Sequence, residues 1–525
     1  MASDSRPRPK WPYIAGIAIG LLTGLVLVIV FRARDVNERT RQWVVRELRS
    51  RFNSEVELES LSVGVFPRMT VSGEGLSLRY HNRTDLPPMF HVEKFSFHLG
   101  WMGLLRAPRR IKGVYVENMT ITVPPRGERR RINLQERVPS LMVDEIVCNN
   151  TDLVIVPKKE GKEPLDFDIH DLVLTSVGGG KPFKFRGNLT NAKPKGEIAT
   201  NGQFGPWDAD EPGDTHVSGI YKFTNANLGP LPGIGGLLSS NGNYRGQLNE
   251  IEVAGETDTP NFSLDPIGRA LPLHTEFSAT VNGTDGDTYL HPVRATLLQS
   301  LIVANGSVIR APTKGGHLIT LSVTTDKARL EDILLLASKS ERPFMTGGLN
   351  LNTKFVLPPG PAKVLDRLKL DGNFAVTEGQ WASAEVREKL ESLSRHAEGQ
   401  ATNEAEGSSV SDLGGIFTLD KSILTFKNLT FSVPGAEVRL QGTYTLPSEQ
   451  LDFRGDLRMQ AKLSKTVTGK KSFFLKAIDP FFAKKGAGTQ LPIRVSGTRA
   501  NPTIGVSVFH KTMKKNLGGQ NSSPK

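Results

Sequence analysis

The sequence has almost no cysteine: Cys148 is the only one in 525 residues. A single cysteine excludes an intramolecular disulfide framework, and it excludes a zinc site built from several thiolates. The redox compartment does not follow from one thiol. We interpret Cys148 as a small hydrophobic side chain of a core.

The chain also lacks the common motifs of catalysis. Its ten histidines are far apart, without a His-x-x-x-His pair, and it has no Gly-x-Ser-x-Gly elbow. The segment from Gly469 to Ser472 lacks the upstream glycine of a phosphate loop. The segment from Asn282 to Asp287 has a calcium-like spacing of carboxylates, but it favours a β-turn. We therefore expect a protein that is not an enzyme and that holds no metal or cofactor.

Aromatic residues are scarce, at 7% of the chain, although the formal net charge is +12. Platforms for single-stranded nucleic acid interleave basic residues with aromatic ones. The basic clusters at 106–110 and 126–131 show no such interleaving. We interpret them as solvated loops, with contact to anionic lipid headgroups as the alternative. We expect no nucleic-acid partner.

Only one long apolar run is present, from Pro12 to Phe31, and it carries no charge. About 20 helical residues cross a hydrocarbon core of ~30 Å once. The run therefore predicts a transmembrane anchor at 11–31 behind a basic tail at 1–10. A cleaved signal peptide is the alternative, but its apolar region is typically only ~7–15 residues long. The anchor residues that we single out are Trp11, Ile14, Gly16, Gly20, Gly24 and Phe31.

The three anchor glycines recur every four residues and so share one helix face. This spacing permits close approach of a second helix, and it is one route by which other envelope proteins could bind. The general abundance of glycine in membrane helices is the other interpretation. Arginines are more numerous after the anchor than before it, so the charge rule alone places the large segment in the cytoplasm.

The rest of the chain predicts a mainly β fold, because apolar residues alternate with polar ones between frequent Gly and Pro. Alternation of this kind is typical of an antiparallel sheet with one wet face. A motif of glycine, any residue and an apolar residue recurs, and it favours either one elongated curved sheet or several stacked β-domains. The motif glycines are Gly187, Gly219, Gly242, Gly372, Gly415, Gly442 and Gly455.

A few short amphipathic helices interrupt the strands. Trp43, Val44, Leu48 and Phe52 follow helical spacing within a juxtamembrane segment at 32–55. Further helices are predicted at 330–337 and 381–397, and an amphipathic segment at 473–482. The domains that we expect are a β-rich region at 56–380, a helix and linker at 381–412, a C-terminal β region at 413–510 and a disordered tail at 511–525.

Three segments resemble the AsmA family. Val56–Arg79 contains a Phe66-Pro67 step and then a glycine-led strand, behind the predicted anchor and helix, as at the start of that family. Gly414–Leu446 and Gly486–Val506 resemble the family's C-terminal region. The resemblance covers roughly residues 11–125 and 375–508.

The resemblance implies a single-pass protein of the bacterial inner membrane with its large C-terminal part in the periplasm. Such β-groove proteins are related to TamB and to bridge-like lipid transporters, and they support outer-membrane assembly and lipid homeostasis. We expect phospholipid as the partner, together with other envelope proteins at the anchor or the C-terminal end. A passive envelope scaffold without lipid transfer is the alternative. The candidate lipid-facing groove residues are Phe417, Leu419, Phe431, Val433, Val438, Leu440, Tyr444 and Leu446.

Overall fold

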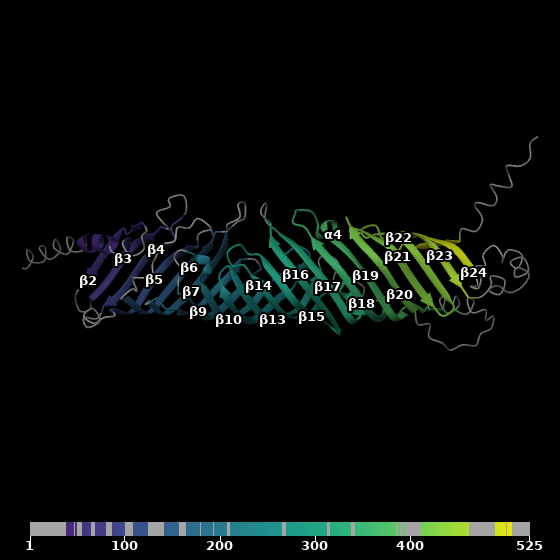
Figure 1. The fold of residues 1–525 in the computed structure, drawn as a ribbon, viewed down its shortest axis with the longest axis horizontal. Coiled ribbons are helices and arrows are strands. Elements are labelled where there is room, and N and C mark those ends of the chain that lie inside the picture. The colour runs from purple at the N-terminus through teal and green to yellow at the C-terminus, as the bar shows by residue number, and fades with distance from the viewer. Residues whose placement is uncertain are drawn as a thin grey trace, which may run out of the picture. The chain divides into compact units, whose positions relative to one another are not determined.

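The computed structural model describes residues 38 to 506, with short gaps and longer ones at 80–86, 100–108, 124–140, 157–163, 395–410 and 461–488. Strands dominate the described residues, which confirms the mainly β class (Figure 1). The chain divides into two compact units. The first comprises residues 1–158, 164–190 and 199–219, and the second comprises residues 159–163, 191–198 and 220–525.

The first unit is an open sheet in which β1 and β2 both pair with β3 and consecutive strands pair from β3 to β8. It contains a short 3₁₀ turn at Pro212–Asp214, and its division from the second unit passes through β8, β9 and β10. The strands are β1 (Val56–Glu57), β2 (Ser60–Gly64), β3 (Met69–Leu78), β4 (Phe90–Leu99), β5 (Arg109–Val123), β6 (Leu141–Ile155), β7 (Leu165–Gly178), β8 (Phe183–Ala192), β9 (Lys195–Phe204) and β10 (His216–Asn227).

Strands β5 and β6 depart from the expected antiparallel pattern. They run parallel, from the pair Arg109 with Leu141 to the pair Val123 with Ile155. Parallel neighbours need a crossover of a dozen or more residues, and the segment 124–140 supplies that length. The predicted basic cluster at 126–131 belongs to this segment, which lies outside the described residues. The alternation in the sequence could not reveal this, because it is the same in both orientations.

The second unit is an open curved sheet whose strands pair antiparallel with their neighbours in the sequence from β12 to β25. It also contains the short helices α3 (Leu330–Ala337) and α4 (Val364–Arg367). Helix α3 confirms the helix predicted at 330–337. The strands are β11 (Ile234–Gly235), β12 (Leu237–Gln247), β13 (Glu250–Leu264), β14 (Leu271–Val281), β15 (Thr288–Leu297), β16 (Ser300–Arg310), β17 (His317–Arg329), β18 (Met345–Leu357), β19 (Lys369–Trp381), β20 (Ser411–Asp420), β21 (Ile423–Val433), β22 (Ala436–Thr445), β23 (Gln450–Met459), β24 (Thr489–Thr498) and β25 (Pro502–Val506).

Each sheet has one apolar side, which we call the inner face, and one polar side, which we call the outer face. In the first unit, Val92, Val116, Met119 and Cys148 form a buried inner cluster. Burial raises the pKa of the Cys148 thiol to about 12, so the expected role of this cysteine as a small core side chain is confirmed.

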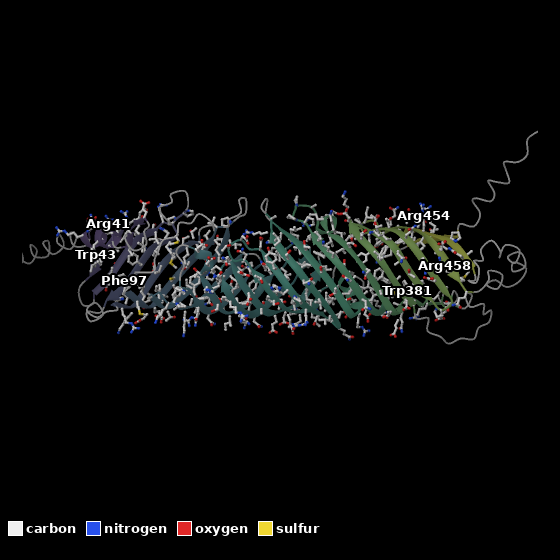
Figure 2. All side chains as sticks on the ribbon, in the orientation of Figure 1. Arg41, Trp43, Phe97, Trp381, Arg454 and Arg458 are labelled. Atoms are coloured by element: carbon white, nitrogen blue, oxygen red, sulfur yellow. The ribbon has the colours of Figure 1, made fainter. Side chains whose placement is uncertain are left out.

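The N-terminal helix (residues 38–46 and 48–49) packs on the first strands of the first unit. Val44, Val45 and Leu48 contact the buried clusters of β1 to β3. The predicted helical face included Trp43, and this was wrong. Trp43, labelled in Figure 2, is 55% exposed. Val45 takes the inward position, where it packs on the buried clusters. The helical period allows both assignments when every third or fourth residue is apolar.

The boundary between β19 and the helix that follows it differs from the expectation. We predicted a helix from 381 to 397, but Trp381 is the last residue of β19 and pairs with Met345 of β18. Helical residues follow between 384 and 394. Beyond the linker, β20 pairs directly with β19, so the sheet continues across the 381–412 segment.

Helix α3 is fixed to the second sheet by its buried acid. Asp332 accepts hydrogen bonds from the Ser300 hydroxyl (2.7 Å) and from the Gln299 backbone N–H (3.1 Å). Leu330 and Ile333 pack on the inner cluster of Ala328, Met345, Leu349 and Val376. The helix thus covers the inner face at the beginning of β18.

No helix among the described residues is both long and apolar enough to cross a bilayer. The predicted anchor at 11–31, the basic tail at 1–10, the amphipathic segment at 473–482 and the tail at 511–525 lie outside the described residues. The anchor residues Trp11, Ile14, Gly16, Gly20, Gly24 and Phe31 therefore stay a prediction.

Candidate functional site: the inner face of β18 to β24

Backbone pairing brings apolar residues from seven strands of the second unit onto one face. Phe417 of β20 lies opposite Phe426 of β21, and Phe426 lies opposite Gly442 of β22. Gly442 in turn lies opposite Phe453 of β23. Because directly opposed residues point to the same side of a sheet, these positions form one row.

Aromatic rings of this row contact one another, together with Phe374 of β19, which lies on the same face two residues from Gly372, the partner of Phe417. The ring centroids of Phe374 and Phe417 are 6.1 Å apart, and those of Phe374 and Phe426 are 6.3 Å apart. Phe426 and Phe453 follow at 5.8 Å. We call Phe374, Phe417, Phe426 and Phe453 the aromatic ladder. These separations lie in the range that favours tilted and edge-to-face contacts.

Glycine explains how rings from non-adjacent strands meet. Phe426 and Phe453 belong to β21 and β23, with β22 between them, and neighbouring strands are ~4.8 Å apart. Gly442 has no side chain to separate the two rings. A Cβ atom at this position would lie only 2.1 Å from the carbonyl oxygen of Asp452, so the two strands approach too closely for any other residue.

The motif glycines of this region therefore have a common role. Gly372, Gly415, Gly442 and Gly455 lie at paired positions on the inner face. At Gly455 a Cβ atom would be 1.8 Å from the carbonyl oxygen of Arg439. The motif marks close strand approach within one curved sheet, which favours the elongated-sheet interpretation over stacked domains in this unit.

A second row runs parallel to the ladder. Its residues are paired in succession from β19 to β24, in the order Val376, Leu413, Phe431, Val438, Leu457 and Leu491. Trp381 lies at one end of β19, with its ring 6.2 Å from Phe431 and 6.0 Å from Phe344. Its indole nitrogen is buried and has no hydrogen-bond partner among the described residues.

The eight predicted groove residues share this face. Seven of them occupy paired inner positions of β20 to β22, namely Phe417, Leu419, Phe431, Val433, Val438, Leu440 and Tyr444. The eighth, Leu446, follows just beyond β22. Phe417, Leu419 and Val433 are buried, whereas the others are half-buried. The structure thus brings them together, and whether they contact lipid stays a prediction.

Sequence reasoning missed several members of the site, namely Phe374, Trp381, Phe426 and Phe453. Phe374 and Phe453 belong to recognised alternating strands, but nothing in the sequence pairs them with Phe417 and Phe426. Trp381 was assigned to the following helix. A useful signal was present in the glycines, since an inner glycine leaves room for aromatic rings on the flanking strands.

The chemistry of the site is that of an uncharged surface. The paired inner positions of the described strands β18 to β24 carry no acidic or basic side chain. Burial raises the pKa of the Tyr444 hydroxyl, with the Glu449 carboxylate adding to the effect, so this hydroxyl stays neutral. Charges occupy the outer face instead, for example the pair Arg494–Asp452 at 3.1 Å.

The segment from Asn282 to Asp287 forms a turn, as the sequence favoured. The Asn282 side-chain oxygen accepts hydrogen bonds from Thr284, and one Asp285 carboxylate oxygen accepts the Asp287 N–H at 3.1 Å. An Asp287 carboxylate oxygen accepts the Arg310 N–H at 2.8 Å. These oxygens serve the backbone of the turn and of β16. No metal-ligating cluster occurs among the described residues.

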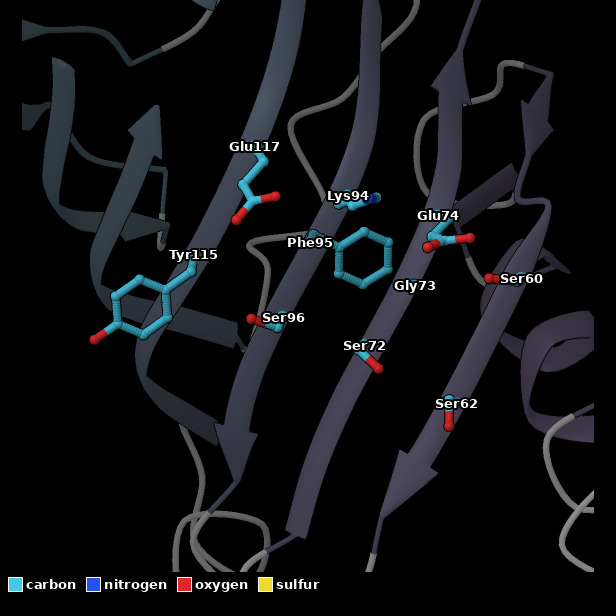
Figure 3. Close-up of a pocket in the computed structure, with 10 residues that line it drawn as sticks. All are labelled: Ser60, Ser62, Ser72, Gly73, Glu74, Lys94, Phe95, Ser96, Tyr115 and Glu117. Atoms are coloured by element: carbon cyan, nitrogen blue, oxygen red, sulfur yellow. The ribbon is translucent and has the colours of Figure 1, made fainter. Parts of the chain in front are cut away.

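A hollow of about 370 Å³ lies on β2 to β5 of the first unit (Figure 3). Its walls combine serine hydroxyls with the row Glu74, Lys94 and Glu117, which are paired across three strands. Tyr115 borders it and is 53% exposed. The hollow is open, and its lining mixes charged and hydroxyl groups with the rings of Phe95 and Tyr115. It is therefore unlike the uncharged inner face of the second unit.

Comparison with known proteins adds no relative to this geometry. No family model, no curated protein and no solved structure matches the chain.

Proposed function

We propose that this chain is a membrane-tethered, AsmA-like lipid-binding protein that shields phospholipid acyl chains on the inner face of β18 to β24 and moves them along it. The observation that carries the proposal is the uncharged inner face, on which seven consecutive strands present aromatic and aliphatic side chains. The proposal places the anchor at 11–31 in the bacterial inner membrane and the large C-terminal part in the periplasm.

The dimensions and energetics of the face suit an acyl chain. Seven strands at ~4.8 Å spacing span about 30 Å, which exceeds one acyl chain, since a chain extends through half of a ~30 Å hydrocarbon core. Each methylene group removed from water contributes ~0.8 kcal/mol. Binding of this kind requires no acid, base or metal, in keeping with the uncharged inner positions.

Two adjacent residues of β22 provide a direct test. Leu440 faces inward opposite Leu429 and Gly455, whereas Gln441 faces outward opposite Arg454. A photo-reactive benzoylphenylalanine at position 440 should form adducts with phospholipid in cells, and the same group at position 441 should not. Mass spectrometry of the cross-linked chain identifies the adduct.

The passive scaffold predicts a different result. If the inner face is closed to lipid, position 440 yields no more lipid adduct than position 441, and the purified chain carries no phospholipid in several detergents. That outcome would overturn lipid binding and support the scaffold. A phosphatase fusion after Lys525 tests the location separately, because its activity requires a periplasmic C-terminus.

A further inference from the structure

The N-terminal helix has two chemically different sides. At 100° per residue, Val44, Val45 and Leu48 fall on one side, and these residues pack on the sheet. Arg39, Trp43 and Arg46 fall on the opposite side with the spacing i, i+4 and i+7, and all three are exposed. We call these three residues the outer helix surface.

Two other arginines of the helix tie it to the first strands of the sheet. Arg41 donates a hydrogen bond to the carbonyl oxygen of Leu58 at 2.7 Å, and Arg49 donates one to the carbonyl oxygen of Val56 at 3.0 Å. Glu38 pairs with Arg41 at 2.7 Å, so its carboxylate is already matched. The helix therefore cannot turn its outer surface inward without breaking its contacts with Val56 of β1 and with Leu58.

Exposure of the tryptophan needs an explanation. Trp43 is 55% exposed, although a buried indole contributes a large apolar area. Tryptophan flanked by arginines is the composition that membrane interfaces favour, because the indole lies at the level of the headgroups while the cations meet anionic lipids. A core position for Trp43 is not available, since Val45 and Leu48 already occupy it.

Chain length places the helix close to a bilayer. The uncharged run ends at Phe31, and only residues 32 to 37 separate it from Glu38. Six residues span at most about 20 Å even when fully extended. A chain anchored through this run would keep the helix within reach of the headgroups.

We infer that the outer helix surface, Arg39, Trp43 and Arg46, docks on the surface of an anionic bilayer and thereby fixes the first edge of the sheet to the membrane. This inference rests on the membrane tether of the proposed function, but it does not require lipid on the inner face. The occupant is the lipid headgroup layer itself, and the docking adds a second point of attachment to the tether.

The test uses the full chain reconstituted into vesicles of phosphatidylethanolamine and phosphatidylglycerol. The fluorescence of the chain minus that of the Trp43→Phe variant isolates the Trp43 signal from the other tryptophans. We expect this signal to be quenched by lipids brominated near the headgroup and to be protected from iodide in the water. In neutral phosphatidylcholine vesicles both effects should weaken.

Charge variants sharpen the test. Each arginine near an anionic surface contributes about 1 kcal/mol, so Arg39→Gln or Arg46→Gln should lower the ratio of docked to undocked helix about fivefold. Arg245→Gln is the matched control, because Arg245 is an exposed arginine of β12, with 78% of its side chain accessible. This control should leave the Trp43 signal unchanged.

Two outcomes would overturn the inference. Trp43 that is as accessible to iodide in vesicles as in detergent, and not quenched by brominated lipid, does not dock. Trp43 that is protected from iodide but not quenched by brominated lipid is covered by protein, from a second copy or another partner. Either result can occur together with lipid adducts at position 440, so failure of this inference is distinguishable from failure of the proposed function.

Discussion

Two stretches of the second unit share one pairing scheme but differ in the side chains that line their inner faces. The row of inner positions that contains Phe374 and Leu351 of β19 and β18 continues through Thr325, Ile302 and Ala295. It then reaches Thr275 and Thr257 of β14 and β13. The inner face of β12 to β16, which we call the small-residue stretch, carries many glycine, alanine, serine and threonine residues. The aromatic ladder belongs to β19 to β23.

The difference shows that the strand pairing does not determine which side chains line the inner face. Both stretches use inner glycines at close strand approaches, for example Gly242 opposite Gly255 and Gly442 opposite Phe453. In the small-residue stretch the space over Gly242 and Gly255 is filled by Tyr221, whose hydroxyl lies 3.1 Å from the Ser240 hydroxyl. Under the proposed function, the ladder is the place where an acyl chain is held and the small-residue stretch is a place through which it passes.

Replacing Gly442 by valine should have the largest effect on the ladder. Its Cβ atom would lie 2.1 Å from the carbonyl oxygen of Asp452, so β22 and β23 would have to separate. We expect the free energy of unfolding to fall by about 3 kcal/mol or more, measured by urea unfolding. Gly113→Val is the control, because a Cβ atom there meets nothing within 4 Å. Equal stability of the two variants would contradict the role of Gly442.

Truncating Phe453 should have the next largest effect. Phe453 is 6% exposed and contacts Phe426, so Phe453→Ala removes a buried ring and should cost about 3 kcal/mol. Leu290→Ala removes a half-buried side chain of the small-residue stretch and should cost about 1 kcal/mol. Thermal and urea unfolding compare them. Equal losses would mean that the two stretches do not differ in packing.

An aromatic ring added to the small-residue stretch tests whether an acyl chain passes along this stretch, rather than how stable the fold is. Ala304 faces inward opposite Val293 and Val323, and it is half-buried, so Ala304→Phe should change stability by no more than about 1 kcal/mol. We expect slower transfer of a fluorescent phospholipid between vesicles, with adduct formation at position 440 retained. Asn305→Phe, on the outer face, should transfer at the normal rate. Unchanged transfer by Ala304→Phe would remove this stretch from the path.

The smallest effect concerns the outer face of the small-residue stretch. A hydrogen bond of 2.7 Å that the His274 ring donates to the Asp258 carboxylate raises the pKa of His274 above its ordinary value. This hydrogen bond therefore stabilises the folded state fully below pH ~6.5, and the stabilisation is lost as the pH rises through the raised pKa of His274. Because 39% of the His274 side chain is exposed, we expect less than about 0.5 kcal/mol. Urea unfolding at pH 5.5 and 8.5 should show this difference, and His274→Gln should abolish it.

The sequence predicted the strands well because alternation is a local property. Leu429, Phe431 and Val433 are apolar at every second position, and they form one face of β21 as expected. The site was predicted in part, since Phe417 and Phe431 were recognised. Phe426 was missed because a bulge between Phe426 and Leu429 interrupts the alternation, and a bulge depends on the partner strand.

Features that depend on distant parts of the chain could not be predicted. The parallel pairing of β5 with β6 follows from a crossover, and the contact between Phe374 and Phe426 follows from the register of three strands. The side of the helix that holds Trp43 was decided by competition with Val45 for the surface of β1 to β3. In the first two cases the deciding partner is separated from the residue by more chain than any local pattern covers. In the third, the deciding surface lies outside the helix and begins at Val56.

Nearest-neighbour pairing from β12 to β25 also bears on how this part of the chain folds. Each strand pairs with its neighbour in the sequence, so the contact order of this part is low. Most of the connections that must close are short, and the longer ones at 382–410 and 460–488 join strands that are still adjacent in the sheet. Hairpins can then join the sheet one after another, in the manner of repeat proteins, without waiting for the far end of the chain. A chain that is delivered across a membrane from its N-terminus onwards could fold in the order in which it emerges.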